Sequence, residues 1–374
     1  MKRIFNHIKT GVVLLAFLAV SCEKDEVVNH QTTITESLPS FPDDNSSLDL
    51  NIVRSNEMVI FEWEPSKAAD NSVVFYELLM DKDNGDFSSP IYKGTPAKLG
   101  SENRISLSHS ALNEIVKGLG VAELETVKLK WKVVSTNGVN SVSSNAVRSM
   151  TVRRALDLPN ELVLYGTGTE AGDDRGKALK LKKVSDTRFE VYTSLQPGTY
   201  GLVKGAVNET DDVFNFKGSD ISDGMGNITV NAGVYRITVD LLTGLNFTEI
   251  QSVGLWFAAK NAVSNVLTYR GNGVWEAKDI PIAWAQVSWG KDERYKFRIT
   301  EKDAAGTVTN KFWGSASKDN NRPTPSSAAS YYYLNQVDNT QWDYTYKFAS
   351  ESQTTDITLT MQGAMPYTHS ITYK

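Results

Sequence analysis

The sequence predicts an all-β protein: an N-terminal sandwich of immunoglobulin or fibronectin III type, followed by two further β-sandwich domains. After residue 45, apolar and polar residues alternate at period two, and Gly, Asn-Gly and Pro interrupt the runs, which is the pattern of strands and turns. Met58–Trp63 and Val127–Val133 are the clearest strands. In the second of them the apolar residues share one face and the lysines share the other.

The predicted domain order follows from these runs and from the composition of the segments between them. We expect a signal peptide (1–21), a lipidated tether (22–45), the first sandwich (46–153) and two β-sandwich domains (158–250 and 251–374). Trp63 on an early strand and Trp131 on a late strand favour an immunoglobulin-like first domain. One short helix is expected there, capped by Ser108 or Ser110 and ended by Gly118.

The last two domains look like two copies of one module, because similar strand patterns recur at matching positions. Four pairs of segments carry this comparison: 161–165 with 252–257, 189–191 with 274–276, 214–218 with 310–314, and 234–239 with 344–348. The two copies differ in aromatic content. Residues 158–250 contain no tryptophan, whereas 251–374 hold six of the eight in the chain.

The first residues have the pattern of a secretory signal, with basic residues ahead of an apolar run, Gly11–Val20, that is too short to span a bilayer. Cys22 is the sole cysteine and lies where a bacterial lipoprotein carries its diacylglycerol. A secreted chain of this length would otherwise have paired cysteines or none. Cys22 is therefore predicted to be lipidated; the alternative is an ordinary signal peptide with an unrelated cysteine.

Four charged residues follow the predicted lipidation site: Glu23, Lys24, Asp25 and Glu26. They resemble the acidic export tag that sends Bacteroidetes lipoproteins to the outer leaflet. The alternative is a solvated charge run at the start of the tether. From these residues the sequence predicts an outer-membrane, cell-surface location with a lipid as the membrane anchor.

Composition excludes several classes of function. With 44 acidic against 39 basic side chains, the chain lacks the basic surface of nucleic-acid-binding proteins. The histidines after the signal, at 30, 109 and 369, are too scattered for a histidine-based triad or a zinc cluster. The Asp81–Asp86 segment begins like a calcium loop, but its glycine is one place early, so we interpret it as a hairpin turn. No metal, cofactor or catalytic residue is predicted.

An ordered series of motifs resembles the SusE/SusF-type surface lipoproteins of Bacteroidetes glycan-utilisation systems. These are Phe61-Glu62-Trp63, Tyr76–Asp81, Gly85–Pro90 and Trp131-Lys132-Val133, behind the predicted lipid anchor and tag. The resemblance covers the anchor and the first sandwich well and the rest more loosely. It implies that the last two domains are starch-binding-module-like sandwiches, and that the protein works beside a SusC/SusD-like importer.

Aromatic side chains suit glycan recognition because their rings cover the C–H faces of sugars at low entropic cost, while polar side chains bond the hydroxyls. In the last domain Trp256 and Trp275 lie in apolar strands and are expected to be core. The glycan-binding candidates lie mostly in polar contexts: Trp284, Trp289, Trp313, Trp342, Lys291, Arg294, Arg298 and Asn320. Trp284 and Trp289 are five residues apart, so one of them should be exposed, and Trp313 is expected at the mouth of a loop.

The leading hypothesis is a surface protein that binds an extracellular oligosaccharide or polysaccharide, possibly starch-like, without cleaving it. A non-catalytic structural or adhesion protein is the alternative. A glycoside hydrolase is a weaker one, because two carboxylates suffice for that reaction. The acidic pairs Asp173-Asp174 and Asp211-Asp212 are expected to be solvated loops.

Overall fold

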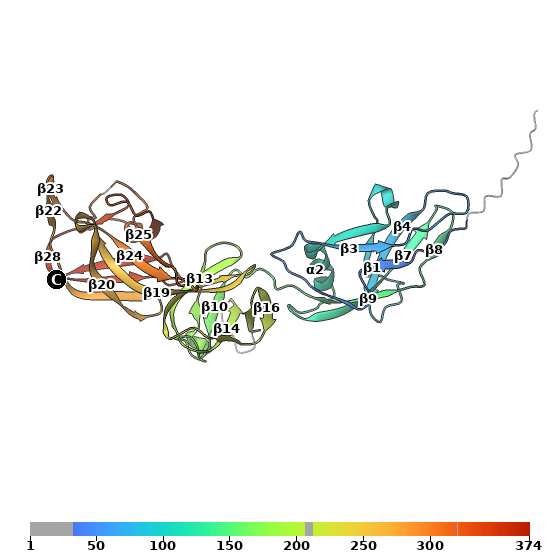
Figure 1. Ribbon diagram of the computed structural model, residues 1–374, viewed down its shortest axis with the longest axis horizontal. Helices are drawn as coiled ribbons and strands as arrows, with labels where there is room; N and C mark the ends of the chain where they lie inside the picture. The colour runs from blue at the N-terminus through green and yellow to red at the C-terminus, as the bar shows by residue number, and fades with distance from the viewer. Residues whose placement is uncertain (1–32, 206–211, 320) are drawn as a thin grey trace, which may run out of the picture. The chain divides into compact units, whose positions relative to one another are not determined.

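The computed structural model describes residues 33–205, 212–319 and 321–374, and the chain forms two compact units. Unit 1 comprises residues 33–48, 58–107 and 127–152, and unit 2 comprises 49–57, 108–126 and 153–374. The predicted all-β fold is confirmed: among the described residues α2 (His109–Gly118) is the only α-helix, and strands make up the body of both units (Figure 1). The short 3-10 turns are η1 (Lys98–Gly100), η2 (Arg175–Lys177), η3 (Ala258–Lys260) and η4 (Ala329–Tyr332).

Unit 1 is built on two sheets. One has the order β1-β3-β6, with β1 (Pro39–Phe41), β3 (Met58–Trp63) and β6 (Arg104–Ser108). The other has the order β2-β9-β7-β4-β5, with β8 also on β7; these strands are β2 (Ser46–Asp49), β9 (Arg148–Arg153), β7 (Thr126–Thr136), β4 (Phe75–Lys82), β5 (Tyr92–Gly94) and β8 (Ser141–Ser143). Phe61 meets Trp131 edge to face, with ring centroids 5.3 Å apart, so the predicted apolar face of β7 is buried in the core.

Two details of the first predicted domain differ from the expectation. Residues 39–41 pair with β3, and Ser37, which is buried, shares a 2.9 Å hydrogen bond with the Ser135 hydroxyl. Part of the predicted tether is therefore sandwich, and residues 22–32 lie outside the described residues. The predicted helix is confirmed as α2, capped by Ser108, whose hydroxyl accepts the Ala111 N–H. It belongs to unit 2 rather than unit 1.

Unit 2 contains the two predicted modules, which we call the middle module (158–250) and the last module (251–374). The middle module has β10 (Leu162–Tyr165), β11 (Leu179–Lys180), β12 (Lys182–Lys183), β13 (Arg188–Leu195), β14 (Gly198–Lys204), β15 (Phe214–Lys217), β16 (Asp220–Asp223), β17 (Gly226–Ile228) and β18 (Gly233–Asp240). The last module has β20 (Ala262–Gly271), β21 (Val274–Ile282), β22 (Ala285–Val287), β23 (Gly290–Asp292), β24 (Arg294–Lys302), β25 (Val308–Gly314), β26 (Asn335–Val337), β27 (Tyr346–Lys347), β28 (Ser352–Thr360) and β29 (Thr368–Tyr373). The long strand β19 (Gly244–Phe257) belongs to both.

Strand pairing shows that the modules share one topology. In the middle module β10 lies between β11 and β14, and β14 pairs with β15; in the last module the second half of β19 lies between β20 and β24, and β24 pairs with β25. The opposite sheets also correspond, because β13-β18-β19 matches β21-β28-β29. Three of the four segment pairs noted in the sequence are equivalent by this criterion. The fourth is wrong, since β18 corresponds to β28 rather than to the residues around β27.

The two modules are joined through β19 rather than by a linker. Its first half pairs with β18, its second half pairs with β20, and its register with β24 shifts between Ile250 and Ser252. The predicted boundary at 250/251 thus falls at an irregularity inside one continuous strand. Arg236 on β18 also forms an ion pair with the buried carboxylate of Glu301 on β24, with 2.8 Å between Nη2 and Oε2.

Candidate functional site

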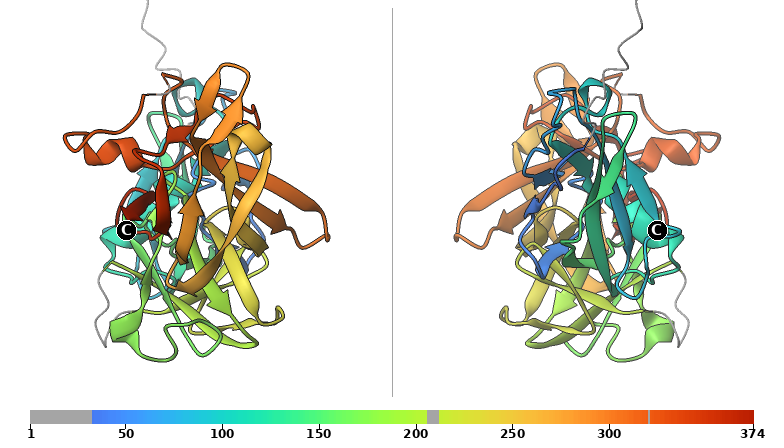
Figure 2. Two further views of the ribbon diagram at one scale, coloured as in Figure 1. Left: turned by 90° about the vertical axis from the view of Figure 1, so that its left-hand side faces the viewer. Right: turned by 90° about the vertical axis from the view of Figure 1, so that its right-hand side faces the viewer.

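The last module differs from the middle module by two long insertions. Between β13 and β14 the middle module has only Gln196 and Pro197, whereas residues 283–293 separate β21 from β24 and form the hairpin β22–β23. Residues 315–351 likewise replace the shorter 218–232 connection. Figure 1 shows the hairpin standing out from the sheets, and Figure 2 shows the second insertion with η4 standing to one side of them. Trp284, Trp289 and Trp342 all lie in these insertions.

Trp289, in the turn between β22 and β23, belongs to a group of four side chains drawn from the hairpin, β24 and the second insertion, which we call the tip cluster: Trp289, Trp342, Arg294 and Asp292. The Trp289 side chain is 63% exposed, and its ring meets Trp342 nearly at right angles, with centroids 5.4 Å apart. The Arg294 guanidinium lies 4.3 Å from the Trp342 ring centroid and donates from Nε to Asp292 at 2.9 Å. The prediction that one of Trp284 and Trp289 is exposed is confirmed for Trp289.

Hydrogen bonds from Arg294 keep the carboxyl group of Asp292 ionised. Burial raises the pKa of Asp292, but the hydrogen bonds from Arg294, with a smaller contribution from Trp289, outweigh it and leave the pKa below its ordinary value. Asp292 is therefore a carboxylate, and its hydrogen bonds direct the guanidinium across the indole of Trp342. This arrangement combines an exposed ring surface with a fixed polar edge.

The Trp342 loop (338–345) is held in place by hydrogen bonds from a buried lysine. The Lys296 side chain is inaccessible to solvent, and its ammonium donates to the carbonyls of Asp338 at 3.1 Å and Thr340 at 2.6 Å. The same ammonium lies 4.9 Å and 4.8 Å from the ring centroids of Trp256 and Phe312. Because a buried ammonium without partners is costly, these bonds keep the loop in one position. The ring of Trp342 is therefore already positioned before a ligand binds.

Trp284 belongs to a second, more enclosed group. Its ring packs against the core of the last module, and the Arg322 guanidinium lies 4.4 Å from its centroid. Arg322 is in turn held by Glu293 at 2.7 Å. Lys291 forms a 2.9 Å ion pair with Glu351, which also accepts the backbone N–H of Trp284. Lys291 therefore contributes to the position of the hairpin rather than to the tip cluster.

The structure separates the remaining predicted site residues from the tip cluster. Trp313 is 8% exposed and packs edge to face on Tyr367, so the expected position at a loop mouth is wrong. Its place on β25 opposite Phe297 directs it into the core. Arg298 lies on β24 four residues beyond Arg294, about 13 Å along the strand. Asn320 lies outside the described residues. Trp256 and Trp275 are buried, as expected.

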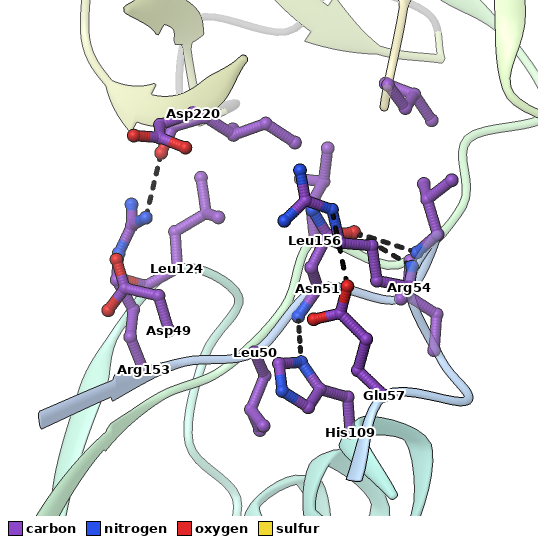
Figure 3. A pocket seen from close by; sticks show the side chains of 14 residues that line it. Asp49, Leu50, Asn51, Arg54, Glu57, His109, Leu124, Arg153, Leu156 and Asp220 are labelled. Atoms are coloured by element: carbon purple, nitrogen blue, oxygen red, sulfur yellow. Dashed lines mark hydrogen bonds and ion pairs between the residues drawn. The ribbon is translucent and has the colours of Figure 1, made fainter. Parts of the chain in front are cut away.

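A separate cavity of about 160 Å³ lies in unit 2, beside α2 (Figure 3). His109 lines it and accepts the Asn51 backbone N–H at 3.2 Å. Arg54 pairs with Glu57 nearby, and Arg153 donates to the Ile221 carbonyl. Its lining has charged and aliphatic groups but no Phe, Tyr or Trp, so it lacks the ring surfaces of a glycan site.

Two other kinds of site are absent from the described residues. No group of three or more His, Cys, Asp or Glu side chains in that part of the chain could hold a metal ion. None of the helices within 33–205, 212–319 and 321–374 has the length and apolar character to cross a membrane. Cys22 and the tag at 23–26 lie outside these ranges. Sequence reasoning missed Asp292, Lys296 and Arg322, whose contacts join residues far apart in the chain and leave no local pattern.

Residues 23–134 match the family model described as SusE outer membrane protein. This part of the chain is SusE-like. The match confirms the resemblance predicted from the ordered motifs, and the family's description agrees with the predicted outer-membrane location. The matched region covers most of the first sandwich and ends before the two modules of unit 2.

Comparison with solved structures gives weaker likenesses. One is to SusF from Bacteroides thetaiotaomicron, at 10% identity and a TM-score of 0.24, covering 91% of this chain and 77% of that chain. Another is to a Ca²⁺-stabilised adhesin with which an Antarctic bacterium binds ice, at 10% identity and a TM-score of 0.18, covering 91% of this chain and 98% of that chain. No curated protein matches the sequence.

Proposed function

We propose that this protein is a lipid-anchored outer-membrane protein that binds extracellular glycan through the tip cluster and assists its capture for a SusC/SusD-like importer. The observation that carries the proposal is the exposed Trp289 ring, which lies in an insertion that the middle module lacks. This ring packs against Trp342, and Arg294 lies over the Trp342 ring. Exposed aromatic rings beside fixed polar groups suit sugar faces and hydroxyls.

The polar edge of the tip cluster favours glycan over a protein partner. Adhesion surfaces that bind proteins present contiguous apolar area, whereas here the Arg294 guanidinium lies over the Trp342 ring and is held there by Asp292, beside the exposed indole of Trp289. The charges of this pair compensate each other. An uncharged oligosaccharide, such as a starch-like glucan, therefore fits the cluster better than a strongly charged ligand.

The acidic residues of the hairpin support binding without hydrolysis. A glycosidase needs one carboxyl with a raised pKa to protonate the leaving group. Asp292 has a lowered pKa and is held by Arg294, and Glu293 is held by Arg322 and lies 3.6 Å from Lys347. Both carboxylates serve to fix the cationic side chains that lie over Trp342 and Trp284.

Anchoring is the second part of the proposal and depends on Cys22. Cys22→Ala should release the protein from the membrane fraction, because the thiol that takes the lipid is gone. Replacing residues 23–26 with alanine should leave the protein membrane-bound but protected from protease added to intact cells. Retention of Cys22→Ala in membranes, or digestion of the tag variant on intact cells, would contradict these assignments.

The released Cys22→Ala protein also tests the proposed binding. A glycan array should give a signal with neutral oligosaccharides, and prolonged incubation with the bound glycan should produce no new reducing ends. New reducing ends that disappear on mutation of one carboxylate would place the protein among the glycoside hydrolases. A blank array would contradict the proposal.

A further inference from the structure

The Trp342 loop carries a second aromatic side chain in an unusual backbone conformation. Tyr344 has φ of +56°, in the left-handed region that bulky residues rarely adopt. The conformation is held by a bond from the Ser315 N–H to the Tyr344 carbonyl at 2.8 Å. It also requires the glycine at 314, because a Cβ there would lie 2.1 Å from that carbonyl oxygen. Strain of this kind persists where the surroundings enforce it, and it is concentrated at functional sites.

Tyr344 lines a shallow pocket of about 430 Å³ beside the edge strand β26. The other lining residues include Ser315, Asn335, Gln336, Val337 and Asp338. Amide, hydroxyl and carboxylate groups thus lie around one aromatic ring. Gln336 is exposed on an edge strand, where its side chain can reach a ligand. The pocket has the same combination of ring and polar groups as the tip cluster, without sharing its residues.

The tip cluster and the pocket are connected by a short, fixed stretch of chain. Trp342 and Tyr344 are two residues apart, so their Cα atoms are within about 7 Å of each other. The Thr345 hydroxyl donates to the Trp342 carbonyl at 3.0 Å, and Lys318 pairs with Asp343 at 3.0 Å. Together with the bonds from Lys296 below, these contacts fix the two rings relative to each other. The loop therefore presents one ring to the tip cluster and one to the pocket.

We infer that the pocket around Tyr344 is a second sugar subsite, and that the last module takes a neutral oligosaccharide lengthwise, with one part at the tip cluster and a neighbouring part at Tyr344. The inference rests on the proposed function and specifies its ligand as a chain of several units rather than a single sugar. Lys318, whose ammonium lies 4.7 Å from the Tyr344 ring centroid, balances the charge of Asp343. The carboxylate of Asp338 leaves this end without the excess positive charge that an anionic glycan would need.

The decisive variant is Tyr344→Gly, which removes the ring while placing at 344 the residue that best tolerates positive φ. Asn261→Gly is the matched control, because Asn261 also has positive φ and lies in the last module, in a turn that does not line the pocket. Binding would be measured by calorimetry for the short and long members of three neutral series: maltotriose and maltoheptaose, cellotriose and cellohexaose, xylotriose and xylohexaose.

The unmodified protein should bind the long member of at least one series about tenfold more tightly than the short one. Tyr344→Gly should abolish that difference and leave the affinity for the short member unchanged, while Asn261→Gly changes neither. Unchanged affinity of Tyr344→Gly for the long member would overturn the inference, as would an equal loss for both lengths. If none of the six oligosaccharides binds the unmodified protein, the proposed function fails and this inference fails with it.

Discussion

The middle and last modules have the same strand order, yet only the last carries tryptophan. Every pairing of β10, β13, β14, β15 and β18 has its counterpart in the last module. The differences lie in the connections: a two-residue turn has become the hairpin β22–β23, and a short connection has become the segment that carries Trp342 and Tyr344. The scaffold therefore supplies stability in both copies, and the insertions of one copy supply the exposed rings.

Tryptophans on the scaffold strands and tryptophans in the insertions should respond differently to mutation. Trp313→Ala should lower the free energy of unfolding by about 3–5 kcal/mol, because it empties a buried site against Tyr367. Trp289→Ala, at an exposed position, should lower it by less than about 1 kcal/mol. Urea denaturation of both variants tests this division. Equal losses would show that the two residues do not differ in structural role.

The shared strand predicts that the modules depend on each other. Glu301→Ala removes the closest partner of the half-buried Arg236, leaving Glu190 at 3.9 Å, and should cost about 2–3 kcal/mol of unfolding free energy. Glu249→Ala is the matched control, because its pair with Lys302 is more exposed to solvent than the Arg236–Glu301 pair and is worth less than about 1 kcal/mol. Chemical denaturation measures both. A loss for Glu301→Ala no larger than the control would mean that the junction contributes little.

The core of the last module should make the protein sensitive to acid. Burial lowers the pKa of His369 to about 3; its Nδ1 donates to the Tyr332 carbonyl and its Nε2 accepts from the Tyr295 hydroxyl. The unfolded chain takes up a proton below pH 6.5 while the native histidine stays neutral, so stability is lost as pH falls from 6.5 toward 3.

Between pH 6.5 and 5 this contribution amounts to about 1.5 kcal/mol. In the His369→Gln variant, the free energy of unfolding should fall by about 1.5 kcal/mol less over this pH range than in the unmodified protein, as measured by denaturation at several pH values. His109, whose pKa burial also lowers, is present in both proteins and cancels in the difference. Identical pH dependence of the two proteins would contradict a neutral buried His369.

Local sequence pattern was sufficient for the elements and insufficient for the site. The period-two runs, the Ser108 cap and three of the four repeat pairs are visible because each depends on nearby residues. The continuity of β19 was also visible, since no glycine or proline interrupts 245–253, but the likeness of 252–257 to 161–165 suggested a new domain. Trp313 was misplaced because its face depends on register with β24. The contacts of Arg294 with Trp342 and of Lys296 with Asp338 join distant segments, which no local pattern reveals.

The central claim is that the exposed ring of Trp289 binds the glycan, and a measurement of binding affinity tests it most directly. Trp289→Ala should weaken binding of the neutral oligosaccharide that the unmodified protein binds most tightly, by about tenfold or more, because a stacking ring is lost from the tip cluster. Val266→Ala is the matched control, since Val266 is 64% exposed in the same module but lies on β20 rather than in an insertion. Calorimetric titration should show a weakened Trp289→Ala and an unchanged Val266→Ala, both fully folded. Full affinity in Trp289→Ala would contradict the account and move the binding site away from the hairpin.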